Sequence, residues 1–382
     1  MSAGTEQVIS GLEGVLAGES SVTFLDGLAD PSVLEYRGYN IHDIAETTSF
    51  EEVAFLVIEG HLPNKAELAA FDQELKAARA IPPQVIDTIR ALPKGIHPMA
   101  AFRTAVSGLA CYDPQQEDNS KEANRAKAGR MTAQFATIVA AQHRINEGKP
   151  VVEPDPSLGH AANFLYMLNG ERGDDLWVRT LETTMNLYAE HEANASTFAV
   201  RVVVGTNSDL HSAIVAGIGA LKGPAHGGAA DDSIALIQEI GDVENVKPWV
   251  DKAFSERRLI PGFGHRVYKT GDARTPHLRN MCRALAEHSA TKDSSWVDIA
   301  LATEDYIRSM KRLVANVDLY AAAALYYLDF PLNLFTNFVA AARIVGWSAN
   351  AIEQFEKNRI IRPRMKYVGE RARTFVPLEQ RG

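Results

Sequence analysis

The sequence predicts an all-α protein with a large multi-helix domain and a smaller inserted helical domain. Helix-start signals recur along the chain, and each precedes an apolar run that ends at glycine or proline. No stretch sustains the apolar–polar alternation typical of a strand, so strands should be few and short. A length of 382 residues exceeds one small core and favours two domains.

An irregular stretch, residues 1–45, comes first, with short extended pieces such as 21–25. Two capping boxes then open helices, Ser49 with Glu52 and Asn64 with Glu67. Further helices are expected at 97–111, 121–146, 158–168, 174–190, 195–204, 209–221, 229–239, 246–255, 275–288, 295–313, 317–327, 333–345 and 349–357.

A domain boundary is expected near residue 222, where a helix gives way to a Gly-Pro turn. The chain should return to the first domain near residues 318–323. The large domain would then comprise residues 1–222 and 321–382, and the small domain residues 223–320.

Composition narrows the class of protein. A net charge of −9 argues against nucleic acid as a partner. The two cysteines, Cys111 and Cys282, stand alone, so neither a disulfide framework nor a thiolate metal site is expected, and a reduced cytoplasmic setting follows. The N-terminus lacks a signal-peptide pattern, and no apolar run approaches the roughly 20 residues of a membrane helix.

Two histidines stand in segments rich in glycine and proline. His226 lies in Gly-Pro-Ala-His-Gly-Gly (223–228), and His265 lies in Pro-Gly-Phe-Gly-His-Arg-Val-Tyr-Lys (261–269). Glycine allows a ligand to approach the backbone closely, and proline interrupts helices. A histidine on such a turn is expected to face a ligand, where with a carboxylate it can exchange protons near neutral pH.

Asp318 begins a strongly apolar helix, where a carboxylate is costly without partners. One interpretation is a helix N-cap. The other is a general base whose pKa is raised by partial burial. The sequence leaves both open.

Basic residues concentrate in two segments of this acidic chain. These are Arg257, Arg258, Arg266, Lys269, Arg274 and Arg279 in the first, and Arg359, Arg362, Arg364, Lys366, Arg371 and Arg373 in the second. A solvated charged face is the simpler interpretation. Arginines beside a bent histidine segment also suit carboxylate or phosphate ligands, because the guanidinium fork binds such groups in pairs.

His191 lies in His-Glu-Ala-Asn-Ala-Ser-Thr (191–197). A zinc-protease helix would need a second histidine at position 195, which is alanine, and no other metal spacing is present. A structural histidine remains one interpretation. The neighbouring Asn194, Ser196 and Thr197 suit the wall of a polar pocket.

Together these segments resemble the citrate synthase family, in its shorter bacterial and archaeal form, over nearly the whole chain. The similar segments, in order, are residues 11–15, 36–41, 191–198, 223–228, 261–269, 316–318, 342–347 and 362–364. Each motif is weak alone, but their order is specific.

The resemblance implies that oxaloacetate condenses with acetyl-CoA and that the thioester is hydrolysed, giving citrate and CoA in the first step of the citric acid cycle. No cofactor is implied, since acetyl-CoA is a substrate. The implied catalytic residues are His226, His265 and Asp318. The implied oxaloacetate ligands are His191, Arg274, Arg343 and Arg362. The implied CoA contacts are Leu259, Ile260, Gly262, Gly264 and Lys269. Arg362 would come from a neighbouring subunit, which implies a homodimer with a shared site.

Three residues depart from the usual family pattern: Ala273, Leu319 and Asn337. None removes a catalytic group, but Leu319 and Asn337 leave the acyl-chain preference open. The resemblance therefore also allows a 2-methylcitrate synthase using propionyl-CoA, because one methylene is worth only about 1–3 kcal/mol of discrimination. A non-catalytic protein that binds acidic metabolites is a third alternative, although binding alone needs no general base.

Overall fold

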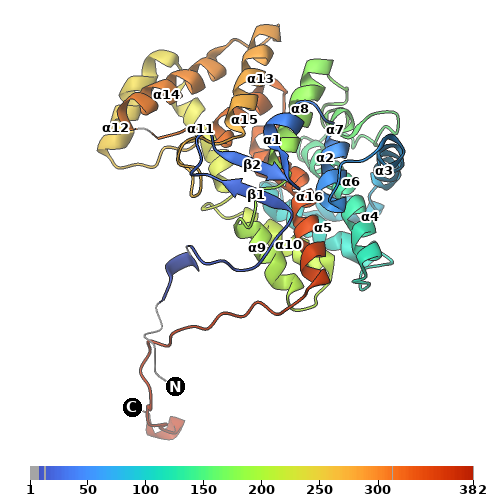
Figure 1. Cartoon of the computed structure of the whole chain (residues 1–382), viewed down its shortest axis with the longest axis vertical. Helices are drawn as coiled ribbons and strands as arrows, with labels where there is room; N and C mark the ends of the chain where they lie inside the picture. Colours follow the sequence, from blue (N-terminus) through green and yellow to red (C-terminus); the bar gives the residue numbers. More distant parts are fainter. Residues whose placement is uncertain (1–7, 13, 312, 382) are drawn as a thin grey trace.

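The computed structural model describes residues 8–12, 14–311 and 313–381, so Glu13 of the N-terminal motif lies outside the described residues. Within this part of the chain, the fold comprises sixteen α-helices and one small sheet (Figure 1). The predicted all-α fold with few, short strands is confirmed.

The first ten helices precede the Gly-Pro turn at residue 223. They are α1 (Ile41–Ile44), α2 (Phe50–Glu59), α3 (Lys65–Ala78), α4 (Pro83–Ala91), α5 (Pro98–Leu109), α6 (Lys121–Asn146), α7 (His160–Asn169), α8 (Asp175–Tyr188), α9 (Ala195–Val204) and α10 (Leu210–Leu221). The other six are α11 (Gly228–Ile240), α12 (Val246–Ser255), α13 (Thr275–His288), α14 (Ser295–Lys311), α15 (Val317–Tyr327) and α16 (Phe335–Glu356).

Local capping explains where several helices begin. Both predicted capping boxes are present, at Ser49 with Glu52 and at Asn64 with Glu67. The sequence prediction missed α4, which has proline in its first turn and no side-chain cap.

The prediction of two helices at 333–345 and 349–357 is wrong, because α16 is continuous. Gly346 remains helical, and a side chain at this position would collide with the Glu190 carboxylate. Its backbone N–H bonds to the Ala189 carbonyl oxygen at 3.1 Å. The glycine therefore marks close packing rather than a helix end.

The small sheet corrects the expectation that residues 1–45 are irregular. Strands β1 (Thr23–Asp26), β2 (Val33–Tyr36) and β3 (Tyr39–Asn40) pair antiparallel in that order, with Thr23 opposite Tyr36. The turn between β2 and β3 has positive φ angles at Arg37 and Gly38, which suits a tight hairpin. The expected extended piece at 21–25 falls largely on β1.

The turn between β1 and β2 contacts a distant loop, residues 256–274, which connects α12 to α13. Three hydrogen bonds join them: Lys269 N to Gly27 O at 2.9 Å, Thr270 Oγ1 to Ala29 O at 2.6 Å, and Ser32 Oγ to Gly271 O at 2.5 Å. A Cβ atom on Gly27 would lie 2.6 Å from the Val267 carbonyl oxygen, so glycine permits this approach. The N-terminal hairpin thus supports the loop that carries His265.

Two groups of helices form the body. Helix α16 is buried from Phe335 to Ile352 and packs against α2, α6, α8, α9 and α10. Helices α11–α15 pack on one another, with α15 against α11, α13 and α14, on one side of the body (Figure 1). The expected boundary at residue 320 falls inside α15.

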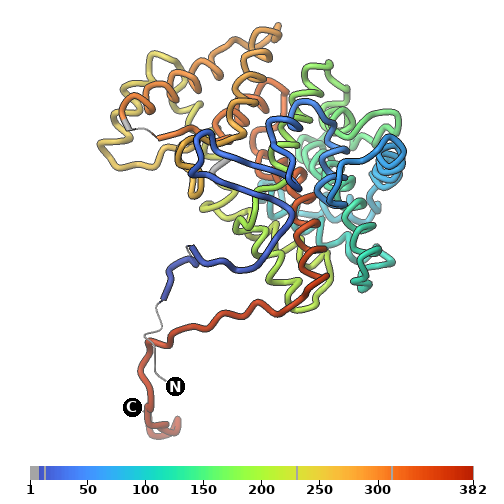
Figure 2. The backbone as a smooth tube through the Cα atoms, viewed as in Figure 1, coloured from blue at the N-terminus to red at the C-terminus, as the bar shows by residue number. Residues whose placement is uncertain are grey.

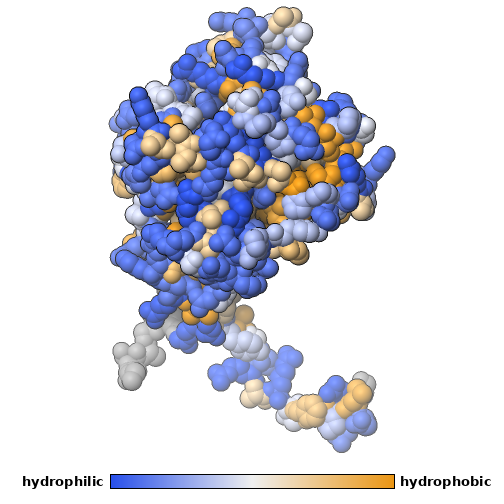
Figure 3. Space-filling view, turned by 90° about the vertical axis from the view of Figure 1, so that its right-hand side faces the viewer, coloured by the Kyte–Doolittle hydropathy of each residue, from blue (hydrophilic) through white to orange (hydrophobic). Residues whose placement is uncertain are grey.

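Both ends of the described chain leave the body as extended segments (Figure 2). The C-terminal tail, residues 357–381, exposes apolar side chains, including Met365, Val368 and Phe375. Hydrophobic residues are visible at its outer end, whereas much of the neighbouring face of the body is hydrophilic (Figure 3). Within the described ranges, no helix has the length and apolar character needed to span a bilayer.

Candidate active site

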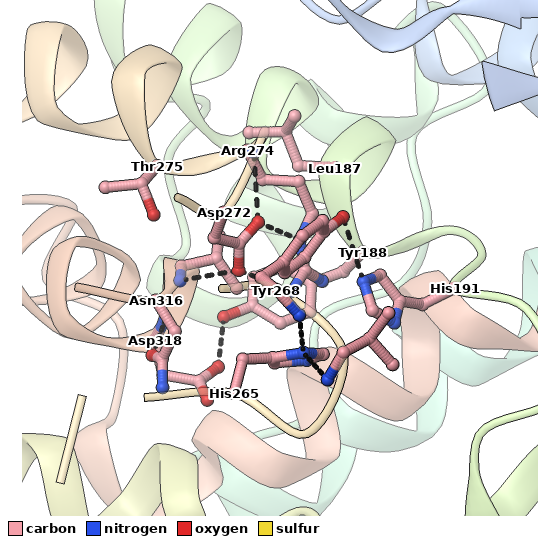
Figure 4. Close-up of polar contacts among 12 residues, drawn as sticks. Leu187, Tyr188, His191, His265, Tyr268, Asp272, Arg274, Thr275, Asn316 and Asp318 are labelled. Carbon is pink, nitrogen blue, oxygen red and sulfur yellow. Dashed lines mark hydrogen bonds and ion pairs between the residues drawn. The ribbon is translucent and has the colours of Figure 1, made fainter. Parts of the chain in front are cut away.

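Asp318 lies in the first turn of α15. Asn316 caps this helix, since its Oδ1 accepts the Asp318 backbone N–H at 3.0 Å, so the N-cap interpretation of Asp318 is wrong. The Tyr188 hydroxyl donates to Asp318 Oδ1 at 2.6 Å (Figure 4). Burial raises the pKa of Asp318, while the Tyr188 bond and the nearby Arg274 oppose that rise. The group can therefore bind a proton more readily than an ordinary aspartate.

His265 lies on the loop 256–274, where its tautomer is fixed by the backbone. Nδ1 accepts the N–H groups of Val267 at 3.1 Å and Tyr268 at 3.2 Å. Burial, with Arg274 nearby, lowers the pKa of His265 to about 4. The neutral ring therefore carries its proton on Nε2, which is the nitrogen left to donate to a ligand.

The same loop is tied to the segment before α15. Gly264 N donates to Val314 O, and Asn316 N donates to Gly262 O, both at 2.9 Å. Gly262 and Gly264 have φ angles of 76° and 77°, which favour glycine. This short pairing brings the backbone that carries His265 beside the start of α15.

His226 lies in the turn before α11 and is held by side chains. Its Nε2 is 2.9 Å from Ser196 Oγ, which also accepts the Trp347 indole N–H at 3.1 Å. Ser196 Oγ lies 2.7 Å from Asn194 Oδ1, so its single hydrogen has two possible acceptors. Burial, with Arg343 nearby, lowers the pKa of His226 to about 4, and the ring is neutral at pH 7.

His191 adjoins His265. The two rings lie 5.2 Å apart, and His191 Nε2 is 3.2 Å from the Tyr268 hydroxyl. Burial, followed by the charge of Arg274, holds the pKa of His191 well below its usual range. This third neutral histidine adds a polar group to the cluster without adding charge.

Two buried arginines supply positive charge. The Nε and Nη2 atoms of Arg274 bind the two carboxylate oxygens of Asp272 at 2.9 and 2.8 Å, and Nη1 takes no part in this fork (Figure 4). Arg343 donates from Nε to the Tyr188 carbonyl oxygen at 2.7 Å, which leaves both Nη atoms outside that bond. Asp272 therefore orients Arg274, and guanidinium nitrogens remain for an anionic ligand.

The expected CoA residues share the loop 256–274 but differ in exposure. Leu259 is 90% exposed, whereas Ile260 is buried. The Lys269 ammonium donates to the carbonyl oxygens of His265 at 3.2 Å and Arg266 at 3.1 Å. Lys269 thus supports the loop backbone in this structure.

Arg362 is not brought to this cluster within one chain. Its neighbour Ile361 packs against Gly205, just beyond the C-terminal end of α9. Asn194 caps the other end of this helix, and ten helical residues span about 15 Å. Among the described residues, no hydrogen bond or ion pair joins Arg362 to the histidines, Asp318 or the two buried arginines.

The sequence analysis did not predict three residues of the candidate active site: Tyr188, Tyr268, and Asp272 as the residue that orients Arg274. The latter two stand inside segments that the sequence had already indicated, whereas Tyr188 carried no local signal beyond a helical pattern. In the described part of the chain, no three His, Cys, Asp or Glu side chains are arranged to hold a metal ion.

A half-buried carboxyl group, neutral histidines and two buried arginines together make a site suited to acid–base chemistry on an anionic ligand. The family described as citrate synthase, C-terminal domain, matches residues 11–364. The chain therefore belongs to the citrate synthase family.

Individual relatives cover nearly the full length. The chain is 43% identical over 372 residues to citrate synthase 2 of Bacillus subtilis, covering 97% of this chain and 98% of the relative. It is 40% identical over 364 residues to 2-methylcitrate synthase of Mycobacterium tuberculosis, covering 95% and 91%. A Thermoplasma acidophilum citrate synthase, solved as a ternary complex with carboxymethyl coenzyme A and oxaloacetate, aligns with a TM-score of 0.92 and 34% identity, covering 99% and 100%.

Proposed function

We propose that this protein is a citrate synthase that condenses oxaloacetate with acetyl-CoA and hydrolyses the thioester to citrate and CoA. The observation that carries this proposal is the convergence of a half-buried carboxyl group, Asp318, with a neutral histidine whose proton is on Nε2 and with two buried arginines. Membership of the family supports the same activity.

In the first step, Asp318 takes a proton from the acetyl methyl group, and the C–H electron pair forms an enolate. This proton is weakly acidic, so the negative charge on the thioester oxygen must be stabilised as it develops. His226 would donate to that oxygen from Nδ1. This role requires the Ser196 hydroxyl to point its hydrogen at Nε2 rather than at Asn194.

In the second step, the enolate carbon attacks the keto carbon of oxaloacetate. The keto oxygen gains charge and takes the proton that His265 carries on Nε2. Arg274, Arg343 and His191 would hold the oxaloacetate carboxylates. Water then adds to the thioester carbonyl of the condensed product, and the CoA thiol leaves.

Closure of the small domain, residues 223–320, over the large domain would exclude water from the reaction. Leu259, Ile260, Gly262, Gly264 and Lys269 would contact CoA on the loop that also carries His265. In that state Lys269 would exchange its backbone carbonyl partners for a phosphate of CoA.

A homodimer would complete the site. The C-terminal tail leaves the body with exposed apolar residues, among them Met365 at 94% and Val368 at 89%, which a second copy of the chain would cover. Arg362 lies on this tail and would reach the partner's oxaloacetate site. Both cysteines are free thiols, which supports a cytoplasmic location.

Thiol release from acetyl-CoA and from propionyl-CoA, each with and without oxaloacetate, tests the proposed function. We expect oxaloacetate-dependent release that favours acetyl-CoA. A preference for propionyl-CoA would identify a 2-methylcitrate synthase with the same site. Bound oxaloacetate without thiol release from either substrate would refute catalysis and indicate a binding protein.

Replacing Arg362 with alanine tests the shared site. We expect KM for oxaloacetate to rise by about 10-fold or more, because loss of a charged hydrogen bond costs roughly 1.5–3 kcal/mol. Arg381→Ala, farther along the same tail, is the control. A fully active monomer in gel filtration would rule out a site shared between subunits.

A further inference from the structure

Tyr188 joins two groups of helices at the proposed base. It is the last residue of α8, and its hydroxyl reaches Asp318 in the first turn of α15. The bond measures 2.6 Å and is formed by Oδ1 alone, while Oδ2 accepts no hydrogen bond from the described residues. The two oxygens of one carboxylate are therefore unequal before any substrate arrives.

The ring of Tyr188 is held on several sides. It is 3% exposed and packs edge-on against Phe335 and Phe338, with ring centroids 6.3 Å away in each case. The Arg274 guanidinium carbon lies 5.7 Å from its centroid, and Arg343 holds its carbonyl oxygen. A phenol fixed in this way cannot follow Asp318 through different rotamers, so it selects one.

The charged and titratable groups that act on Asp318 come from several elements. Besides Tyr188, they are Arg274 and Asp272 on the loop before α13, and Arg343 on α16. Helices α13 and α14 pack on α15 but direct Arg279 and Glu304 to Tyr320. Asp231 of α11 bonds to Thr336. Tyr188 therefore differs from the other groups that act on Asp318. It is neutral and donates a hydrogen bond to the carboxylate, whereas Arg274, Asp272 and Arg343 act on it through their charge.

We propose that Tyr188 is a positioning residue that holds Oδ1 of Asp318 and leaves Oδ2 as the atom that receives the substrate proton. This inference rests on the proposed function. The phenol keeps its own proton, because burial and the neighbouring Asp318 hold the pKa of Tyr188 well above its usual range. It therefore donates to the carboxylate throughout the working pH range and favours the ionised form of the base.

The sign of the expected pH effect follows from this bond. Removing a donor to an ionised carboxylate raises the pKa of that carboxyl group. In Tyr188→Phe, a smaller fraction of Asp318 is ionised at low pH, so the acid limb of kcat moves to higher pH. We expect a shift of about 1–2 pH units, from the usual strength of a hydrogen bond to a charged group.

The experiment compares wild type, Tyr188→Phe and the control Tyr327→Phe, with thiol release from acetyl-CoA at saturating oxaloacetate between pH 5.5 and 9.5. Tyr327 is also buried, but its hydroxyl bonds to the Asp293 carbonyl oxygen at 2.8 Å, away from the site. We expect Tyr188→Phe to lose about 10-fold or more of kcat at low pH and to recover as pH rises. Tyr327→Phe should keep the wild-type limb.

A parallel loss at every pH, an unmoved limb, or a limb displaced to lower pH would each overturn the inference. Incorporating 3-fluorotyrosine at position 188 gives an independent test if the Phe variant does not fold. Its phenol is a stronger acid and a stronger donor, so the limb should move in the opposite direction. Absence of thiol release in the wild type would instead reject the proposed function.

Discussion

The turns that carry His226 and His265 hold similar rings by different means. His265 is held by two N–H groups of its own loop, and a hairpin more than 200 residues earlier supports that loop. His226 is held by Ser196, whose hydroxyl can donate or accept. A tautomer fixed by backbone tolerates side-chain changes nearby, whereas one fixed by a hydroxyl depends on a single side chain.

The largest effect is expected at Asp318, the proposed general base. Asp318→Asn should lower kcat by about 10²–10⁴-fold, because the amide cannot take the substrate proton. Oxaloacetate affinity, measured by calorimetry, should stay close to wild type, since Asp318 is not assigned to its carboxylates. Turnover near the wild-type level would remove Asp318 from the mechanism.

A substitution in the N-terminal hairpin should disturb the loop that carries His265. A methyl group at Gly27 would meet Val267 O at 2.6 Å and Tyr268 N at 2.8 Å, so Gly27→Ala should displace the loop. A displacement of about 1 Å can cost roughly 10²-fold in rate. Steady-state kinetics would measure this loss against Gly219→Ala, where the added methyl meets nothing within 4 Å. Equal activity of the two variants would show that the hairpin does not position His265.

The orientation of His226 should depend on one atom, Ser196 Oγ. Ser196→Ala removes the hydroxyl that orients the ring, and we expect kcat to fall by about 10-fold with little change in oxaloacetate affinity. The Trp347 N–H also loses its acceptor, which should lower the free energy of unfolding by roughly 1–3 kcal/mol. Ser309→Ala on the exposed face of α14 is the control. Unchanged kcat in Ser196→Ala would mean that the backbone turn alone orients His226.

Lowering the pH should reduce the free energy of unfolding through both histidines, and this effect should be smaller than those of the substitutions above. Each histidine has a folded-state pKa of about 4, below the ordinary value of 6.5. The unfolded chain therefore binds more protons between pH 6.5 and 4, and the free energy of unfolding should fall as pH decreases through that window. Urea unfolding should show a shallower pH slope in the His226→Gln/His265→Gln double variant. An identical slope would mean that neither ring is neutral because of the fold.

The helices could largely be predicted from sequence because their signals are local. Capping boxes and apolar periodicity lie within a few residues of the helix that they specify, as at Ser49 and Asn64. The continuity of α16 could not be predicted, since Gly346 normally suggests a helix end and its contact is with Glu190, far away in sequence. The strands β2 and β3 were missed because each is too short to show alternation.

The site divides in the same way. His226 and His265 could be predicted as active-site residues because the glycine and proline residues around each histidine are visible in the sequence. The tautomer of His265 depends on dihedral angles that place two N–H groups at one nitrogen, and the sequence does not report these. Tyr188 was missed because its hydroxyl acquires meaning only beside Asp318, 130 residues later.

The contact between the N-terminal hairpin and the loop 256–274 also sets an order of events during synthesis. Ser32 and its partner Gly271 are 239 residues apart. At about 5–20 residues per second, a ribosome needs roughly 10–50 s to make the intervening chain. The turn of the hairpin therefore lacks its contact with the loop 256–274 until almost three-quarters of the polypeptide has been synthesised. A nascent chain arrested before that point would contain most of the helices of the body and still lack the contact that braces the loop of His265.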